Sequence, residues 1–176
     1  KDLYSLEGYS SVYQSTIPGK SKGTGVALYI SDDLSYTVAH DISRCTTDLE
    51  SLFVRVPIDK NSIITIGVVY RPPSGDSEKG ICELKSIIES NPSSGNLQIF
   101  GDFNIDLLKS HESLTNKFED ATIGLGLFPV ISLATHCKPK CRKSCIDNIL
   151  TNRVDSVVSS GVIRDSTSHH SFIFQI

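Results

Sequence analysis

The apolar residues of this chain fall mostly into short runs with the length of a β-strand. The runs Val26–Ile30, Ser51–Val56 and Ile63–Tyr70 are bounded by glycine, proline or polar residues, a pattern typical of strands. Ile63–Tyr70 is strongly β-branched and apolar, which predicts a central strand buried on both faces. Further candidate strands are Tyr9–Tyr13, Tyr36–His40, Cys145–Leu150, Val154–Val158 and the end of the chain at Phe172–Phe174.

Two other segments have the three- and four-residue spacing of an amphipathic helix. In Asp76–Ser90 the apolar positions form one stripe, made by Ile81, Leu84, Ile87 and Ile88. A second helix is expected to begin at Ser113 or Thr115 and to end at Gly124, with Leu114, Phe118 and Ala121 facing inward. Both helices are expected to pack against a sheet.

Length and composition narrow the class of protein. A chain of 176 residues suits a single domain. The net charge of -3 gives no global attraction to nucleic acid, so only a local basic patch can supply one. No apolar run approaches the roughly 18 residues of a membrane span, so no membrane partner is expected. Five unevenly spread cysteines favour reduced thiols in an intracellular compartment.

The stretch Gln98–Asn104 ends an apolar run with an acid and an amide two positions apart. Alternate residues of a strand share a face, so Asp102 and Asn104 are expected to point at one site. A carboxylate takes a proton from water or holds a metal, and an amide donates to an oxygen, so the pair suits a phosphoryl group. A strand end with an Asx turn is the structural alternative.

Tyr70 and Arg71 stand at the end of the predicted central strand, where two prolines force an extended exit. A phenol and a guanidinium at a sheet edge both donate to phosphate. The structural alternative is that Tyr70 belongs to the core and Arg71 is solvated. The basic loop Gly19–Gly25 contains Lys20 and Lys22 and also allows two interpretations. It is either a phosphate-binding loop or a simple hairpin turn.

The segment Thr135–Cys145 contains the positive cluster of the chain: Lys138, Lys140, Arg142 and Lys143. Three cysteines and His136 in the same segment offer four ligands for zinc. Their spacing matches no usual paired-ligand pattern, and Pro139 prevents a helix that would align the thiols. A basic loop that contacts a nucleic-acid backbone is the favoured interpretation.

Asp147 interrupts an apolar run, and an acid there requires a partner. Two histidines, His169 and His170, precede the final apolar run. An aspartate on one strand and a histidine at the head of another predict an orienting pair. Surface histidines in a loop are the alternative.

Read in order, the chain carries the motifs GTGVALYI, ESLFVRV, IGVVYRPP, GDFN, ATH, CIDNIL and SHHSFI. Together they resemble the endonuclease/exonuclease/phosphatase superfamily, most closely the apurinic-type endonuclease domains of non-LTR (LINE-like) retrotransposons. The resemblance implies an α/β (α+β) fold, a four-layer sandwich of two packed mixed sheets flanked by helices. It also implies a Mg²⁺-dependent phosphodiesterase that nicks DNA to leave a 3′ hydroxyl.

By position, the resemblance assigns Asp102 to activation of the attacking water and Asn104 to the phosphate or that water. Tyr70 would donate to the phosphate, Thr135 would support the neighbouring loop, and Asp147 would orient a catalytic histidine at His169. These assignments leave the metal ligands unknown.

The family ends in S-D-H, and two registers fit this chain. In one, Ser168 replaces the aspartate and His169 is the histidine. In the other, His169 replaces the aspartate and His170 is the base.

The family's first strand and helix, with a metal-binding glutamate, would lie before Tyr4, so residues 1–176 are expected to form one N-terminally incomplete domain. One hypothesis is a truncated nuclease within a longer polyprotein that contains a reverse transcriptase, acting in the nucleus if genomic DNA is its substrate. Another is an inactive descendant that binds nucleic acid or protein. A relative that acts on phosphoinositides, sphingomyelin or poly(A) is a third.

Overall fold

The computed structural model describes residues 5–14, 25–91, 95–165 and 167–176. Its main element is a seven-stranded mixed sheet in which β4 pairs with β5 and the other strands follow the order β3-β5-β6-β7-β9-β8. The strands are β3 (Thr37–Val38), β4 (Arg44–Cys45), β5 (Glu50–Pro57), β6 (Ile63–Tyr70), β7 (Asn96–Asp102), β8 (Phe128–Pro129) and β9 (Asp147–Thr151). Of the strand pairs in this sheet, β6 and β7 run parallel and the others antiparallel.

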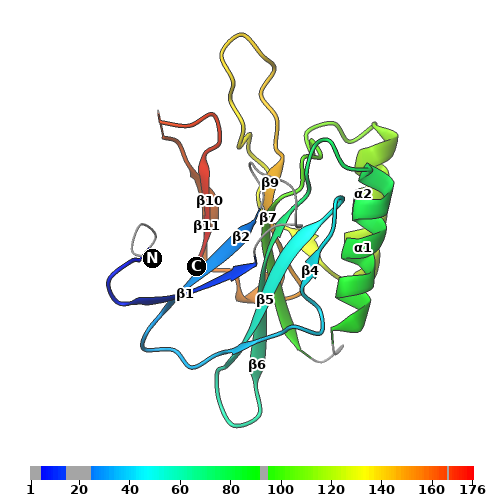
Figure 1. Cartoon of the computed structure of the whole chain (residues 1–176). Coiled ribbons are helices and arrows are strands. Elements are labelled where there is room, and N and C mark those ends of the chain that lie inside the picture. Colours follow the sequence, from blue (N-terminus) through cyan, green and yellow to red (C-terminus); the bar gives the residue numbers. More distant parts are fainter. Residues whose placement is uncertain (1–4, 15–24, 92–94, 166) are drawn as a thin grey trace.

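Two helices, α1 (Ser77–Ser90) and α2 (Ser113–Thr122), cover one face of this sheet (Figure 1). Asp76 caps α1 by accepting the backbone N–H groups of Glu78 and Lys79, which satisfies donors that the first helical turn leaves open. The predicted stripe of α1 packs on the sheet and on Phe118 of α2. Both predicted helices are therefore present, and α2 ends two residues earlier than expected, before the 3-10 turn η1 (Ile123–Leu125).

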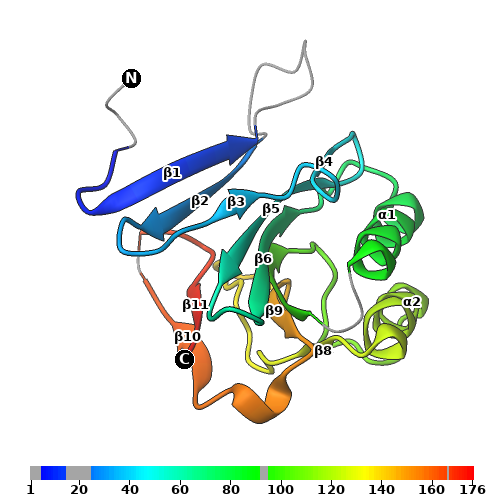
Figure 2. The ribbon, with the colours of Figure 1, turned by 90° about the horizontal axis from the view of Figure 1, so that it is seen from below.

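The opposite face of the sheet carries two antiparallel hairpins (Figure 2). One pairs β1 (Tyr9–Gln14) with β2 (Val26–Ser31), and the other pairs β10 (Ser160–Ile163) with β11 (Phe172–Gln175). The α+β class and the mixed sheet are confirmed. In the described residues, however, the second layer consists of two separate hairpins, and both α-helices lie on one side.

Several element boundaries differ from the prediction. Val154–Val158 is not a strand, because the chain forms the 3-10 turn η2 (Val154–Ser156) there, and the strand begins only at Ser160. The strand expected over Tyr36–His40 shortens to two residues. The face of β6 toward the hairpins is half-buried rather than buried, since the hairpin layer covers less than a full sheet would. The loop residues 19–24 lie outside the described part.

The segment between β8 and β9 projects beyond the end of the sheet at which β6 and β7 terminate (Figure 1). Its two arms pair through a bridge between His136 and Ser144. The fold thus brings strand ends and a projecting segment to one edge. None of the described helices is long and apolar enough to cross a membrane.

Candidate active site

Three of the predicted site residues occupy one row across the sheet. Tyr70 of β6 pairs with Asp102 of β7, and Asp102 pairs with Asp147 of β9. Side chains opposite each other on neighbouring strands lie on the same face, about 5 Å apart at Cβ. The strand register therefore assembles a phenol and two carboxylates at this edge without help from a loop.

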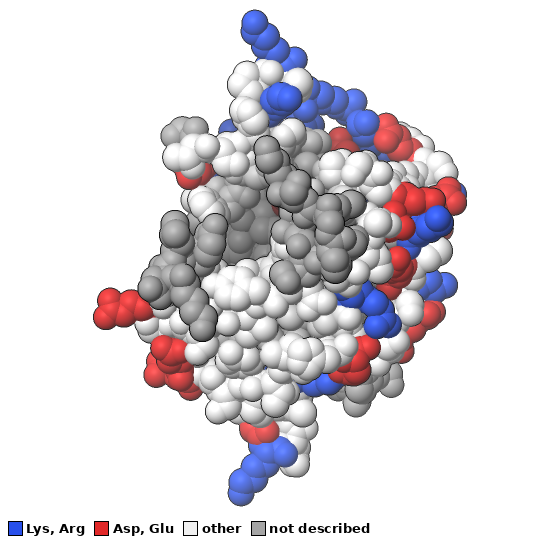
Figure 3. Space-filling view, in the orientation of Figure 1, with Lys and Arg blue, Asp and Glu red and all other residues white. Residues whose placement is uncertain are grey.

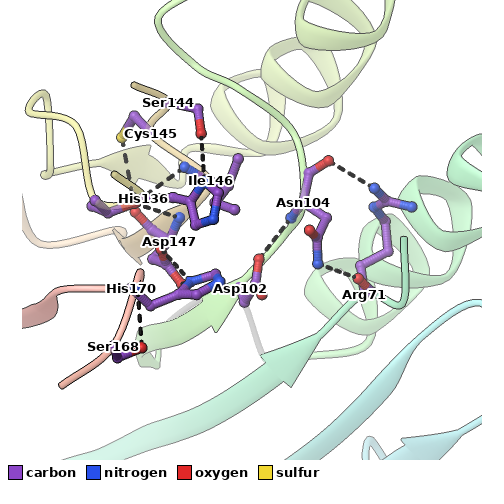
Figure 4. A network of polar contacts seen from close by, with 11 residues as sticks. Arg71, Asp102, Asn104, His136, Ser144, Cys145, Ile146, Asp147, Ser168 and His170 are labelled. Atoms are coloured by element: carbon purple, nitrogen blue, oxygen red, sulfur yellow. Dashed lines mark hydrogen bonds and ion pairs between the residues drawn. The ribbon is translucent and has the colours of Figure 1, made fainter. Parts of the chain in front are cut away.

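His170 lies against Asp147 at the end of the row (Figure 4). Its Nδ1 is 3.1 Å from Oδ1 and 3.2 Å from Oδ2 of Asp147, whose side chain is only 13% exposed. The partner that Asp147 requires is therefore present. The expected pairing of Asp147 with His169 is wrong, because His170 forms a bridge with His136 while His169 is exposed.

Asp102 has an unfavourable electrostatic environment. Burial and the neighbouring charge of Asp147 raise the pKa of the Asp102 carboxyl to about 6. Burial, together with Asp102 and Glu50, also raises the pKa of Tyr70, so the phenol keeps its proton. Two carboxylates that repel each other at neutral pH indicate a place for a proton or a cation.

Asn104 is held by a tight turn after β7 ends at Asp102. Its backbone N–H donates to Oδ1 of Asp102 at 3.0 Å, and its φ of 50° lies in the left-handed region. The Asx turn expected as an alternative is therefore present, and the strand geometry used to align Asp102 with Asn104 was wrong. The turn, rather than strand alternation, brings both side chains to the site (Figure 4).

Arg71 does not point into the site as a phosphate ligand. It is 4% exposed, and its guanidinium donates to three backbone carbonyls, those of Phe103, Pro72 and Asn104. Neither the phosphate-binding nor the solvated interpretation holds, because the side chain runs beneath α1 instead of outward.

Thr135 is fully buried and braces the start of β9. Its Oγ1 accepts the backbone N–H groups of Ile146 and Asp147 at 3.2 and 3.0 Å. Next to it, the ring of His136 packs 4.7 Å from the ring of His170. Burial and His170 lower the pKa of His136. From the sequence, His136 was interpreted only as a candidate zinc ligand. Its place at this site depends on a backbone bridge to His170, which no local sequence pattern predicts.

A cleft of about 430 Å³ opens beside Asn104, between the start of α2 and the projecting segment. Residues from both sides line it: Asn104, Lys109, Arg142, Ser144 and Ile146 are among them.

The basic residues Lys138, Lys140, Arg142 and Lys143 are all exposed on the projecting segment. Figure 3 shows positive side chains gathered at this end of the molecule. Ser168, near His170, is also exposed and accepts the backbone N–H of His170.

The structure gives no support to zinc binding by the three cysteines of this segment. Burial raises the pKa of the Cys145 thiol to about 11, whereas Cys141 is exposed. Thiolate is the form that binds zinc, so a buried neutral thiol is a poor ligand.

The donor atoms of the row fit a divalent cation better. Among the described residues, one group of side chains could hold a metal ion, formed by Asp102, Asp147 and His170. One carboxylate oxygen of each aspartate and one ring nitrogen of the histidine lie within 4.8 Å of one another. Carboxylate oxygens suit hard cations such as Mg²⁺, which also keep waters and substrate oxygens. Because Asp147 already accepts from His170, Asp102 is the better candidate to hold the ion.

Comparison with known proteins identifies relatives of this arrangement. A family model described as endonuclease-reverse transcriptase matches residues 64–174, which is more than half of the chain. None of the curated protein sequences matches the chain.

Several solved structures share the fold at low sequence identity. The endonuclease domain of TRAS1, a telomere-specific non-LTR retrotransposon, is 18% identical with a TM-score of 0.78, over 97% of this chain and 81% of that one. Two others are D. rerio TDP2 complexed with single-strand DNA product (11%, TM-score 0.64, 96% and 76%) and the human nocturnin catalytic domain with bound sulfate (12%, TM-score 0.62, 96% and 73%). Because the family model matches more than half of the chain, the chain belongs to the endonuclease-reverse transcriptase family within the endonuclease/exonuclease/phosphatase superfamily.

Proposed function

We propose that this protein is a Mg²⁺-dependent endonuclease that hydrolyses one phosphodiester bond of DNA. The observation that carries the proposal is the cluster of Asp102, Asp147 and His170, whose candidate ligand atoms lie within 4.8 Å of one another at a strand-end edge. The match to the endonuclease-reverse transcriptase family supports the same chemistry.

Phosphodiester hydrolysis needs a water nucleophile and groups that stabilise charge on the phosphoryl oxygens. With a pKa of about 6, Asp102 is ionised at neutral pH and can hold a cation beside the attacking water. Asp147 contacts Nδ1 of His170 and so fixes the orientation of the ring. His170 would then act as the general base that accepts the proton of the attacking water. The phenol of Tyr70 stays protonated and donates to a phosphoryl oxygen.

A bound Mg²⁺ would neutralise charge on the phosphate during the reaction. Asp102 would hold it, with water and phosphate oxygens in the remaining positions. The repulsion between Asp102 and Asp147 that raises the pKa of Asp102 favours a cation there. Binding of the ion is expected to lower that pKa back toward its ordinary value.

DNA is the proposed substrate because the projecting segment carries four exposed positive residues although the chain as a whole has a charge of -3. Such a cluster binds the phosphate backbone without reading its sequence. By analogy with the TRAS1 domain, we place the protein in a longer retrotransposon polyprotein with a reverse transcriptase, acting on genomic DNA in the nucleus.

The test is cleavage of an end-labelled DNA duplex with Mg²⁺, by this chain and by the complete polypeptide that contains it. The expected product is a nick whose 3′ end a DNA polymerase extends directly. Asp102→Asn should abolish cleavage, whereas Asp120→Asn, an exposed acid on α2, should not. Absence of cleavage by both forms of the protein, with Mg²⁺ or Mn²⁺, would refute the proposal.

A second candidate function is DNA binding without cleavage. One observation favours it: with His170 as the dyad histidine, His169 stands where the resembled family has its aspartate. Retained DNA affinity together with no cleavage, even after His169→Asp, would be the expected result for this function.

A further inference from the structure

Arg71 is a buried charged residue to which the proposed reaction assigns no role. Its side chain lies beneath α1 and its guanidinium reaches the turn that carries Asn104 (Figure 4). We infer that Arg71 is a positioning residue, which fixes the Asp102–Asn104 turn in the geometry needed for phosphodiester cleavage. This inference rests on the proposed function and adds a residue to it.

The contacts between Arg71 and the turn are reciprocal. Nε donates to the carbonyl of Phe103 at 2.6 Å and Nη2 to the carbonyl of Asn104 at 2.8 Å. In return, Nδ2 of Asn104 donates to the carbonyl of Arg71 at 2.9 Å, and the Arg71 N–H donates to the carbonyl of Asp102. Four bonds therefore join one residue to all three members of the turn.

The turn needs such support because of its backbone conformation. Asn104 adopts a φ of 50°, a region that non-glycine residues seldom occupy. Its carbonyl is directed at the guanidinium, and its amide is fixed by the carbonyl of Arg71. Without these bonds, the backbone of Asn104 can relax, and its side chain then leaves the site beside Asp102.

Burial makes the guanidinium difficult to replace. Arg71 is 4% exposed, and burial lowers its pKa, an effect that the charge of Asp102 opposes. A buried cation persists only where its donors are satisfied. The guanidinium donates to three carbonyls at once through its rigid fork, whereas the ammonium of lysine has a different geometry.

Gly80 of α1 shows that the site for this side chain is closely packed. A Cβ on Gly80 would lie 2.8 Å from the carbonyl oxygen of Asp48 and 3.2 Å from Cγ and Cδ of Arg71. Helix α1 therefore approaches Arg71 this closely only because residue 80 lacks a side chain. Gly80→Ala should push α1 away from Asp48 and Arg71, which loosens the packing on the aliphatic part of Arg71 while its charge and its donors remain.

The test compares Arg71→Lys with Arg153→Lys, an exposed arginine paired with Asp155 at the far end of the sheet. Arg71→Lys is expected to lower kcat of nicking about 10- to 100-fold, with KM within about twofold of wild type. Gly80→Ala should lower kcat in the same direction. Arg153→Lys should leave both constants unchanged.

Amide hydrogen exchange gives a readout that needs no cleavage. The Asn104 N–H is held by Oδ1 of Asp102, and Arg71→Lys should speed its exchange at least tenfold while amides of α1 keep their protection. This measurement separates two failures. If wild type does not nick DNA but the exchange effect appears, the positioning role of Arg71 is supported and the proposed function is refuted.

Two results would overturn the inference. One is an Arg71→Lys variant with wild-type kcat and wild-type exchange at Asn104. The other is a loss that appears only in KM, which would indicate that Arg71 contacts substrate. If Arg71→Lys fails to fold, the same two measurements on Gly80→Ala decide in the same way.

Discussion

At the scale of single residues, the site contains a carboxyl group whose ionisation destabilises the folded state. It also contains side chains whose hydrogen bonds fix the surrounding backbone. Burial and the charge of Asp147 raise the pKa of Asp102 to about 6. Arg71 donates hydrogen bonds to the neighbouring backbone, and Thr135 accepts them from it. Functional sites commonly contain such perturbed groups. The consequences can be measured one residue at a time.

The raised pKa of Asp102 predicts how stability depends on pH. A carboxyl with a pKa higher in the folded than in the unfolded state destabilises the fold when ionised. The destabilisation is fully present above pH 6 and disappears as pH falls below about 4. Asp102→Asn, melted in EDTA, should therefore be more stable than wild type at pH 7.5 by about 1–2 kcal/mol, after allowance for solvent screening.

At pH 4 the two proteins should melt at nearly the same temperature. Asp120→Asn serves as the control, because Asp120 is exposed and lies on α2. If Asp102→Asn is less stable than wild type at pH 7.5, the charge of Asp102 stabilises the folded state, which would contradict the prediction.

The contact between Asp147 and His170 distinguishes the two neighbouring histidines. His170→Ala should lower nicking by at least 100-fold, the scale of a lost acid-base group. His169→Ala should change it less than threefold, since His169 is exposed and lies outside the contact. Steady-state nicking rates of the two variants give the answer, and a larger loss in His169→Ala would restore the first register.

At the scale of elements, the site depends on how closely strands and helices approach. Gly67 of β6 lies against the ring of Phe53, so that an added Cβ would be 2.1 Å from Cε1. Phe53 is fully buried and packs in the core between the sheet and the helices. The close fit leaves little freedom for the strands that carry Tyr70 and Asp102.

Gly67→Ala should therefore destabilise the protein by about 1–3 kcal/mol, the usual range for overpacking. For a chain of this size the melting temperature should fall by about 2–4 °C for each kcal/mol. Gly124→Ala is the matched control, because no atom lies within 4 Å of its added Cβ. Equal melting temperatures for the two variants would contradict the packing described here.

Elements with strong periodicity were predictable, and so was part of the site. The β-branched run of β6 and the apolar stripe of α1 each follow one burial pattern, and the sequence shows it directly. Tyr70 was predicted at a strand end, Asp102 at the end of an apolar run and Asp147 as an acid within one, and the strand register places the three side by side. The prediction of a strand at Val154–Val158 was wrong. Val154 and Val158 are exposed, so their hydrophobicity does not indicate burial.

The remaining site residues depend on contacts between distant segments. The choice of His170 over His169 follows from its bridge with His136, 34 positions earlier. The role of Arg71 follows from the approach of α1 at Gly80. Local sequence carries no record of either contact, since both are produced by the tertiary fold.

At the scale of the whole molecule, charge is unevenly distributed. The chain is acidic overall, yet the projecting β8–β9 segment presents four exposed basic residues at the end of the sheet that bears the site. In the proposed function, a DNA backbone attracted to this segment would pass the row of Tyr70, Asp102 and Asp147, and binding would thus be linked with cleavage.

Replacement of Lys138, Lys140, Arg142 and Lys143 by Gln should weaken DNA binding at low salt for every sequence tested. Each lost phosphate contact should reduce the slope of log K against log salt by about 0.9. A control variant removes four basic residues elsewhere: Lys60, Lys79, Lys85 and Arg153. Equal effects of the two variants on affinity would mean that the segment has no special role.

The most direct test of the central claim is nicking of supercoiled plasmid by the complete polypeptide, with and without Mg²⁺, in wild type, Asp102→Asn and His170→Ala. The account predicts conversion to open circles that requires Mg²⁺ and falls at least 100-fold in both variants. Conversion should also decline as pH drops through about 6 in the absence of saturating metal, because Asp102 then becomes protonated. Nicking that persists in Asp102→Asn, or that proceeds equally in EDTA, would contradict the account.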